Sequence, residues 1–367
     1  MTHPDIIVIG GGIAGISAAA ELAAHARVTV IETEAQLGYH STGRSAAIFI
    51  RNYGNATLRA LNAAAAPVFE APEGISDRSL LSPRGELLLA GEDELGTLQA
   101  YCDGASGIDL LEAADAVDLV PILRPERIVR AALERDAQDI DVDRMLQGYA
   151  RLLKARGGQV VTSAPVTAIQ RGHAAWQVTA GDRPFTAPVL VNAAGAWADP
   201  VARLAGVAPL GITPMRRSAA LLPAPLGHDI SRWPLFGSIS ETWYAKPDAG
   251  KLMVSPADED PVAPHDAWPD DMVLAEGLHR YEQAVTVPVT RVDHSWAGLR
   301  SFAADRTPVA GFAPEADGFF WLAGQGGYGV QTAPALARLT AALVTGAEPG
   351  LSDATVAALS PARFHSS

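Results

Sequence analysis

Residues 5–32 read DIIVIGGGIAGISAAAELAAHARVTVIE, and this stretch decides the fold class. It opens with a short β-branched run, passes through four glycines, continues with an alanine-rich segment at 16–26 and closes with a second β-branched run. Such apolar runs are typical of buried strands, and the alanine-rich segment between them is typical of a helix. The order strand, turn, helix, strand predicts a βαβ unit with parallel strands.

The glycines at the turn of this unit predict its ligand. In the pattern Gly10-x-Gly12-x-x-Gly15, the first glycine permits a tight turn, the second lets the backbone approach a pyrophosphate, and the third lets the helix pack on the strand. The positive end of the helix attracts the phosphates. Glu32 ends the second strand, where an acid accepts hydrogen bonds from ribose hydroxyls and disfavours a 2′-phosphate. We therefore expect a dinucleotide to contact Gly10, Gly12, Ile13, Ala14, Gly15 and Glu32.

The length of 367 residues favours about two domains. One βαβ unit cannot complete a parallel sheet, so later segments must supply strands. Helical spacing of apolar residues predicts helices over 56–69, 145–156 and 330–344, whereas 204–295 shows short strands and turns punctuated by prolines. We predict an α/β fold in which a discontinuous Rossmann-like domain consists of 1–78, 142–203 and 295–367. A second, α+β substrate domain built on an antiparallel sheet consists of 79–141 and 204–294.

Composition excludes several classes of function. The net charge of −13 and a pI near 5.1 oppose binding to nucleic acid. The single cysteine, Cys102, excludes an intrachain disulfide, and the scattered histidines form no metal-binding pattern, so we expect no metal. No apolar run reaches the ~18 residues of a membrane span, although a peripheral membrane contact stays compatible with the sequence. A reducing cytoplasm is the expected location.

Two more segments carry the signature of a ligand site. VLVNAAGAWAD at 189–199 is a buried strand that runs into small residues and a tight turn, which permits close backbone approach to a ligand. GQGGYGVQT at 324–332 precedes an amphipathic helix, so free N–H groups and the positive helix end converge there and would stabilise the negative charge of a reduced flavin. Taken alone, the first is also compatible with an ordinary strand and loop, and the second with a glycine-rich connector.

Several motifs in order resemble the D-amino-acid oxidase superfamily of FAD enzymes over nearly the whole chain. They are the N-terminal glycine motif, GYHSTGRSAA at 38–47, VNAAGAWAD at 191–199, Asp305-x-x-Pro308 with Gly311, and GQGGYG at 324–329. More narrowly, the chain resembles bacterial D-arginine dehydrogenases in five segments: YHSTGRSAA at 39–47, LLSPRGE at 80–86, PLGITPMRRSA at 209–219, KPDAG at 246–250 and WAGLRSF at 296–302. The resemblance implies removal of a hydride from the substrate Cα to flavin N5, which leaves an imino acid that hydrolyses to a 2-keto acid and ammonia.

The resemblance also implies the site residues. FAD, bound non-covalently because Cys102 lies outside every flavin motif, would contact His40, Ser41, Thr42, Gly43, Ser45, Ala46, Ala47, Val166, Ala194, Gly195, Trp197, Gly298, Arg300, Gly326, Gly327, Tyr328, Gly329, Val330, Gln331 and Thr332. A planar guanidinium holds a carboxylate by two parallel hydrogen bonds, and Arg217 and Arg300 match the arginines of the family that do so. Strand alternation lets only one of Arg216 and Arg217 enter the site. Tyr53, Tyr244 and Gln331 would shape the amine and side-chain sites, in a pocket with Ile48, Ile50, Glu86, Leu235, Gly237, Gly327 and Val330.

The identity of the substrate stays open at this point. Glu86 matches the acid that receives a guanidinium in D-arginine dehydrogenases, but Ile48 and Ile50 replace a histidine and a threonine, which predicts a narrower and more apolar pocket. We expect a D-amino acid. The alternatives are a secondary amine of the glycine, sarcosine or proline type, a 2-hydroxy acid, or a flavin-bound assembly protein without turnover. The electron acceptor, whether a quinone, another carrier or O2, is also open.

Overall fold

Six strands form the sheet that begins with the βαβ unit. The computed structural model describes residues 4–364, and the strand order is β20-β21-β13-β1-β2-β9. Their bounds are β1 Ile6–Ile9, β2 Val28–Ile31, β9 Gln159–Val161, β13 Val189–Asn192, β20 Val309–Phe312 and β21 Phe319–Ala323. All pairs are parallel except β20 with β21. The prediction that later segments complete the sheet is confirmed.

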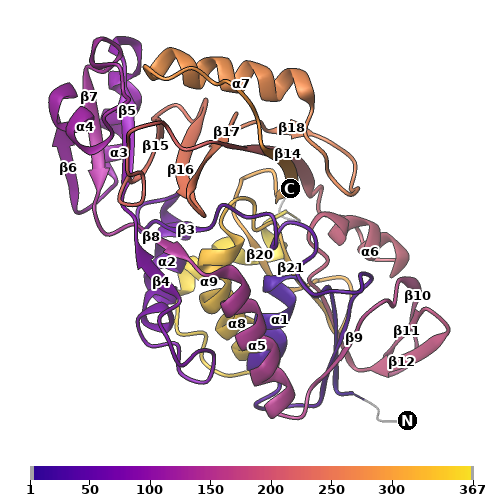
Figure 1. Ribbon diagram of the computed structural model, residues 1–367. Helices are drawn as coiled ribbons and strands as arrows, with labels where there is room; N and C mark the ends of the chain where they lie inside the picture. The colour runs from indigo at the N-terminus through magenta and orange to yellow at the C-terminus, as the bar shows by residue number, and fades with distance from the viewer. Residues whose placement is uncertain (1–3, 365–367) are drawn as a thin grey trace.

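Alternation along β1 explains why both faces of this sheet are covered. Ile6 and Val8 join a cluster with helices α1 Ile13–Leu22, α2 Ala56–Glu70, α5 Val142–Ala155, α8 Gly329–Thr345 and α9 Asp353–Leu359. Ile7 and Ile9 join a second cluster with β10 Val166–Arg171, β11 Trp176–Ala180, β12 Arg183–Ala187 and α6 Ala198–Leu204. Figure 1 shows the helices on one side of β9 and the small β10–β12 sheet on the other. Burial on both faces accounts for the uninterrupted apolar run.

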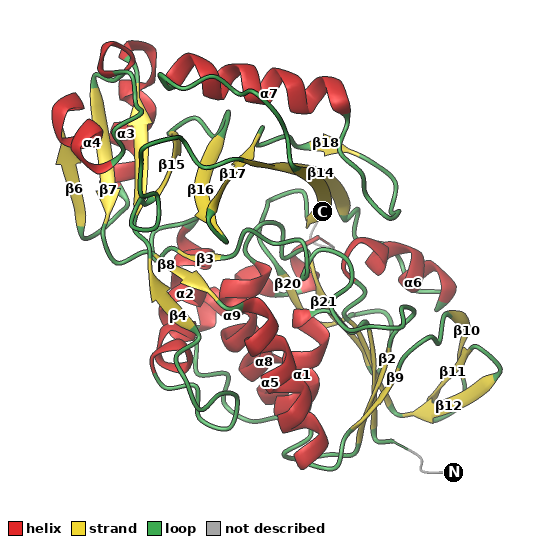
Figure 2. Ribbon diagram, in the orientation of Figure 1, coloured by secondary structure: helices red, strands yellow, loops and turns green. Residues whose placement is uncertain are grey.

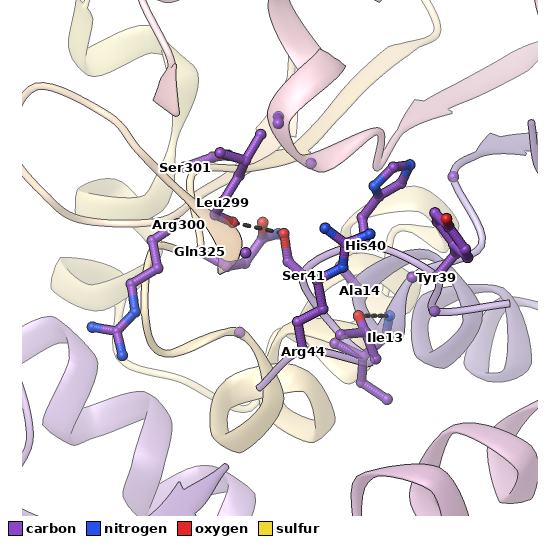
Figure 3. Close-up of a pocket in the computed structure, with 18 of the residues that line it drawn as sticks. Ile13, Ala14, Tyr39, His40, Ser41, Arg44, Leu299, Arg300, Ser301 and Gln325 are labelled. Carbon is purple, nitrogen blue, oxygen red and sulfur yellow. Dashed lines mark hydrogen bonds between the residues drawn. The ribbon is translucent and has the colours of Figure 1, made fainter. Parts of the chain in front are cut away.

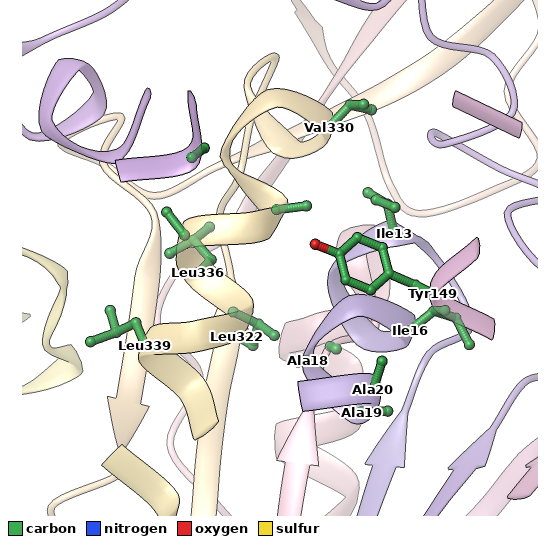
Figure 4. Packing of buried hydrophobic residues seen from close by; sticks show 14 of the residues in the cluster. Ile13, Ile16, Ala18, Ala19, Ala20, Tyr149, Leu322, Val330, Leu336 and Leu339 are labelled. Atoms are coloured by element: carbon green, nitrogen blue, oxygen red, sulfur yellow. The ribbon is translucent and has the colours of Figure 1, made fainter. Parts of the chain in front are cut away.

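The helical layer packs tightly around α1. Figure 4 shows Tyr149 of α5 beside Ile13 and Ile16 of α1, with Leu336 and Leu339 projecting from α8. Small residues on α1 let its neighbours approach, and Ala18, Ala19 and Ala20 are completely buried. This packing fixes the direction in which the N-terminus of α1 points.

Helix α8 is the longest of the described helices, with 17 residues. Pro334 lies in its second turn, where it removes the backbone hydrogen bond to the carbonyl oxygen of Val330. The helix ends at Gly346, which adopts a left-handed conformation with φ of 74°. Within residues 4–364, no helix is both long enough and apolar enough to cross a membrane.

A second, nine-stranded sheet lies above the first in Figure 2. Its order is β18-β14-β17-β16-β15-β5-β7-β6, with β19 paired to β14. The strands are β5 Glu86–Ala90, β6 Ile108–Leu111, β7 Arg130–Glu134, β14 Thr213–Leu222, β15 Leu235–Ser238, β16 Tyr244–Asp248, β17 Lys251–Ser255, β18 Asp260–Pro261 and β19 His294–Phe302. Helices α3 Leu95–Asp103, α4 Ala113–Leu119 and α7 Asp271–Ala284 pack on it, and the short strands β3 Ile48–Phe49, β4 Leu81–Pro83 and β8 Gln138–Ile140 form a separate small sheet.

Helix α7 departs from the expectation of short strands and turns over 204–295. The Asp270 side chain accepts hydrogen bonds from the backbone N–H groups of Met272 and Val273 and so caps the helix. Leu274 and Leu278 lie four residues apart and bury one face against the sheet. The prolines that punctuate this region lie outside α7, so they did not argue against a helix within it.

The division into domains stays a prediction, although the pairing of β19 bears on it. Residues 295–302, which we placed with the nucleotide-binding domain, pair with β14 in the large sheet. The chain then returns to the parallel sheet through β20 and β21. Strand β19 therefore belongs to the large sheet, and its residues 298–301 line the cavity at the edge of the parallel sheet.

The contact between α1 and β1 generates a first prediction. A Cβ at Gly15 would come within 1.9 Å of the carbonyl oxygen of Gly10, so Gly15→Ala must push the helix from the strand. We expect thermal unfolding to show a loss of about 1–3 kcal/mol, the usual cost of overpacking a core. The matched control is Gly96→Ala in α3, where a Cβ meets nothing within 4 Å and helix propensity favours alanine. Equal stability of the two variants would contradict this account.

Candidate active site

A cavity of about 560 Å³ lies at the carboxyl ends of β1, β2 and β13 and extends to strands β14 and β19. Ligands of open α/β sheets bind at this edge. The predicted site residues that line it are Gly10, Gly12, Ile13, Ala14, Glu32, His40, Ser41, Thr42, Ser45, Ala46, Val166, Ala194, Gly195, Trp197, Arg217, Tyr244, Gly298, Arg300, Gly326, Gly327, Gly329 and Val330. Figure 3 shows Tyr39, His40, Ile13 and Ala14 toward one end and Gln325 and Arg300 toward the other. Segments far apart in sequence therefore meet around one elongated space.

The turn at the first end of the cavity is built for a close backbone approach. Gly10 has φ of +113°, and a Cβ there would lie 2.3 Å from the carbonyl oxygen of Ala193, so only glycine fits. Glu32 accepts hydrogen bonds from the backbone N–H groups of Gly11 at 2.5 Å and Glu34 at 2.8 Å. These bonds fix the carboxylate at the end of β2, on the wall of the cavity.

The loop at 38–46 is tied to β19. Ser41 donates a hydrogen bond through Oγ to the carbonyl oxygen of Leu299 at 2.6 Å, the bond drawn in Figure 3. The Trp296 indole donates to the carbonyl oxygen of Arg44 at 3.1 Å, and the Arg44 guanidinium forms an ion pair with Asp266. The loop is thereby held against the large sheet and closes one side of the cavity.

The second end of the cavity offers donors without partners. The Gln325 side chain is 9% exposed, and its Nε2 has no hydrogen-bond partner within the described residues. Arg300 lies against the glycine loop, because a Cβ at Gly327 would come within 2.8 Å of its Nη1. Within residues 4–364, no hydrogen bond or ion pair holds the Arg300 guanidinium. Together with the glycine turn and Glu32, these free donors fit an FAD molecule, and Arg300 and Gln325 would hold its flavin end.

Strand pairing decides which arginine enters the cavity. In the antiparallel pair β14–β19, Arg300 lies opposite Met215 and Gly298 opposite Arg217, so both arginines lie on one face. Arg216 lies on the other face, where its Nη2 donates to Asp260 at 2.8 Å. Arg217 lines the cavity and Arg216 does not. Gly298 leaves the space opposite Arg217 free of a side chain.

Two tyrosines lie near these arginines. Burial raises the pKa of Tyr244, but the charges of Arg300 and Arg217 outweigh burial and bring it below its ordinary value. Tyr53 shows the opposite result, because burial dominates and raises its pKa. The Tyr53 ring contacts that of Tyr328 edge to face, with 5.1 Å between centroids. The Tyr244 hydroxyl is therefore the more polarised of the two.

Some predicted site residues lie behind the cavity wall. They are Gly15, Gly43, Ala47, Ile48, Ile50, Tyr53, Glu86, Leu235, Gly237, Tyr328, Gln331 and Thr332, none of which is among the residues that line it. The Gln331 side chain accepts from the backbone N–H of Ile50 at 3.1 Å and donates to Asn62 at 2.9 Å. It supports the segment before Tyr53 from behind. Within residues 4–364, no group of three or more histidine, cysteine or acidic side chains is placed to hold a metal.

Glu86 belongs to a buried acid pair. It lies opposite Glu134 in the β5–β7 pair, and the two are 7% and 3% exposed. The Tyr101 hydroxyl lies 3.4 Å from Glu86 and 3.5 Å from Glu134. Glu134 also accepts from Asn52 Nδ2 at 2.7 Å. Burial, with the charges of Glu134 and Glu241, raises the pKa of Glu86 to about 8.

Sequence reasoning missed several residues of the site. Gln325 and Arg44 lie within motifs that we had quoted, so the signal was present and only their roles were missed. Glu134, Asp266 and Glu259 lie outside every motif, and only strand pairing and ion pairs bring them to the site. Nothing in their local sequence distinguishes them from surface acids.

Residues 5–343 match the protein family described as FAD dependent oxidoreductase (DAO). The chain belongs to this family. A glycine oxidase of Bacillus licheniformis is 24% identical, with 93% of both chains covered. FAD-dependent oxidoreductase domain-containing protein 1 of Mus musculus is also 24% identical, over 93% of this chain and 81% of the relative. The predicted superfamily resemblance and the FAD cofactor are confirmed.

Solved structures confirm the predicted fold. L-proline dehydrogenase from P. horikoshii superposes with a TM-score of 0.85 at 22% identity, over 99% of this chain and 98% of the other. Glycine oxidase from Geobacillus kaustophilus gives 0.84 at 22% identity, over 97% and 98%. At this identity the likeness establishes the architecture of this FAD-dependent oxidoreductase and leaves its substrate to be inferred from the site.

The buried acid pair generates a second prediction. Because the pKa of Glu86 rises from 4.5 to about 8 on folding, the folded state binds this proton more tightly than the unfolded chain. The resulting stabilisation is complete below pH 4.5 and is lost as the pH rises through 8. Glu86→Gln removes the titration, so thermal unfolding should show the variant gaining stability over the wild type between about pH 5 and about pH 9.

The exposed Glu73, changed to Gln, is the control for this measurement and should track the wild type across the range. A constant difference between Glu86→Gln and the wild type would mean that the Glu86 carboxyl is ionised throughout. The Glu86 carboxyl would then keep its ordinary pKa in the folded protein and carry a permanent negative charge.

Proposed function

We propose that this FAD-dependent oxidoreductase deaminates a D-amino acid oxidatively, with transfer of the Cα hydride to the flavin. The observation that carries the proposal is the pair Arg217 and Arg300, which lie on one face of the β14–β19 pair beside the glycine loop. The bound flavin supplies the hydride acceptor. The product is an imino acid, which hydrolyses to a 2-keto acid and ammonia, and the electrons pass to an acceptor outside this chain.

The two arginines support binding of an α-carboxylate. Arg300 has its N–H donors free, so it can offer two parallel hydrogen bonds to a carboxylate. Arg217 is held at one edge by its neighbours and lines the same cavity. The Tyr244 hydroxyl lies close to both charges and can share the ligand. These groups orient the substrate, which is the main requirement for hydride transfer from a neutral amine.

The side-chain end of the pocket supports an apolar substrate at neutral pH. The resemblance assigns Glu86, Ile48 and Ile50 to the substrate side chain. None of them is among the residues that line the cavity, so they would act on the side chain from behind its wall. A pKa of about 8 keeps the Glu86 carboxyl protonated near pH 7, so it offers no full charge to a cation. Two isoleucines disfavour a polar group at the same place. A cationic side chain would bind better once Glu86 ionises.

A second candidate substrate is a secondary amine or glycine. It is favoured by the names of the relatives, since the Bacillus licheniformis protein is a glycine oxidase and one of the similar structures is an L-proline dehydrogenase. Both substrates carry an α-carboxylate, so the arginine pair serves them equally. The difference between the candidates lies in the side-chain end of the pocket.

Anaerobic reduction of the flavin absorbance tests the substrate class. Near pH 7, D-leucine and D-methionine should bleach the flavin faster than D-arginine, whereas D-arginine should gain on them as the pH rises through 8 and Glu86 ionises. The L-enantiomers, glycine, sarcosine, L-proline and 2-hydroxy acids complete the panel. Reduction by glycine, sarcosine or proline alone would replace the proposal with the second candidate. No reduction by any of these compounds would indicate a flavin-bound protein without turnover on them.

Substitution of Arg300 tests the carboxylate site. Arg300→Met should lower kcat/KM per bound flavin by about 100-fold or more, because an unpaired carboxylate would remain in a buried site. Arg300→Lys should recover part of this loss, since it restores the charge without the planar fork. The control is Arg291→Met, whose side chain is exposed and lies outside the cavity. Unchanged kcat/KM in Arg300→Met would contradict the assignment.

A further inference from the structure

A single glutamate oxygen joins two arginines at the wall of the cavity. Glu259 lies between β17 and β18, and its Oε1 accepts hydrogen bonds from Arg217 Nη2 at 2.8 Å and from Arg306 Nη2 at 2.9 Å. The Arg217 side chain is 8% exposed and that of Glu259 is 28% exposed. Charge-assisted bonds between partly buried groups are stronger than those of surface ion pairs. The three side chains form a bridge between β14 and the turn that follows β19.

The bonds of Arg217 leave one edge of its guanidinium open. Its Nε donates to the carbonyl oxygen of Asp258 at 2.8 Å, while its Nη2 donates to Glu259. A guanidinium presents two donors along its Nε–Nη2 edge and two more along the edge between Nη1 and Nη2. Residues 258–259 therefore occupy the first edge. The Tyr244 hydroxyl also interacts with Arg217, and the remaining donors are left for a ligand in the cavity that Arg217 lines.

The bridge is braced from the far side. The Arg306 guanidinium carbon lies 4.0 Å from the centre of the Phe302 ring, and Arg306 also forms a hydrogen bond with Tyr328 of the glycine loop. Arg306 has φ of 58° and Ala257 has φ of 54°, a conformation that is costly for residues other than glycine. Such backbone persists only where the surroundings hold it, so the segments that carry Glu259 and Arg306 are fixed.

Glu259 keeps its charge across the neutral range. Burial raises its pKa, but the hydrogen bond from Arg306 and the charges of Arg217, Arg306 and Arg300 outweigh burial and lower the pKa below its ordinary value. The bridge is thus an ionised anchor at any pH at which the enzyme would work. Its loss on substitution should accordingly affect binding equally at neutral and alkaline pH.

We propose that Glu259 is a positioning residue for substrate binding: it holds Arg217 by the Nε–Nη2 edge, so that the opposite edge meets the substrate carboxylate. The proposal rests on the proposed function, because only a carboxylate substrate uses that edge. Glu259 does not touch the substrate. It acts through Arg217, whose long side chain would otherwise sample several rotamers in the cavity and lose affinity for entropic reasons.

The chain offers a matched control at the next residue. Asp260 pairs with Arg216 at 2.8 Å, and Arg216 projects from the opposite face of β14. The Asp260 side chain is 50% exposed. Glu259→Gln and Asp260→Asn therefore remove one negative charge each from neighbouring positions, but only the first weakens the hold on an arginine that lines the cavity.

The experiment titrates purified flavin-containing protein with benzoate, a simple carboxylate, and follows the perturbation of the flavin spectrum. In Glu259→Gln the Kd for benzoate and the KM for the amino acid should both rise about 10-fold, the usual effect of losing one charged hydrogen bond. The value of kcat should stay within about 2-fold, since the flavin and the reacting carbon are not touched. Asp260→Asn should match the wild type, and Glu259→Asp, which keeps the charge on a shorter side chain, should fall between.

The outcomes separate this inference from the proposed function. Benzoate binding to Glu259→Gln that equals the wild type overturns the inference alone. Tighter binding also overturns it, because Glu259 would then compete with the substrate for Arg217. A wild type that neither binds benzoate nor is reduced by any amino acid overturns the proposed function and the inference with it. If Glu259→Gln does not retain flavin, the Glu259→Asp variant decides, because unchanged Kd and KM in that variant overturn the inference.

Discussion

The ligand edge of the molecule depends on the contact between Gly15 of α1 and the carbonyl group of Gly10. Because neither residue has a side chain there, α1 lies directly on β1, and the neighbouring strand β13 brings Ala193 against the same turn. The parallel register of β1 with β2 and β13 then places three carboxyl ends at one edge. The cavity, the fixed carboxylate of Glu32 and the N-terminus of α1 all follow from this one approach.

The pairing of β14 with β19 positions the residues at the substrate end of the cavity, as β1 and its neighbouring strands position those at the nucleotide end. Antiparallel register and the two-residue alternation of strands put Arg217 and Arg300 on one face and Arg216 on the other. The loop at 38–46 binds to β19 through Ser41. The large sheet thereby positions the charged residues beside the parallel sheet. The chain passes from one sheet to the other more than once, so that strands of both sheets meet at the cavity.

Local signals in the sequence were sufficient to predict the parts of the site in which the backbone itself approaches the ligand. The glycine turn at 10–15 and the loop at 324–329 can be found from sequence, because a Cβ at Gly10, Gly15 or Gly326 would clash with neighbouring atoms. The alternation of side chains along a strand could also have shown which of Arg216 and Arg217 faces the cavity, once their partner strand was known. Glu134 and Glu259 could not be found in this way, since their roles come from pairing between distant segments. Helix α7 was missed because flanking prolines dominated the pattern of its region.

On the proposed function, the pocket has two ends with different electrostatic behaviour. At the carboxylate end, the raised pKa of Arg300 keeps this guanidinium charged, and the lowered pKa of Glu259 keeps its carboxylate charged near neutral pH. Behind the side-chain end, Glu86 and Glu134 are buried together, and protonation of Glu86 relieves their repulsion. One end of the pocket keeps a positive charge, whereas the charge near the other end depends on the protonation of Glu86. This difference orients any amino acid that enters the pocket. The orientation of the substrate would then be set by the arginines, and its side-chain preference by the protonation of the acid pair.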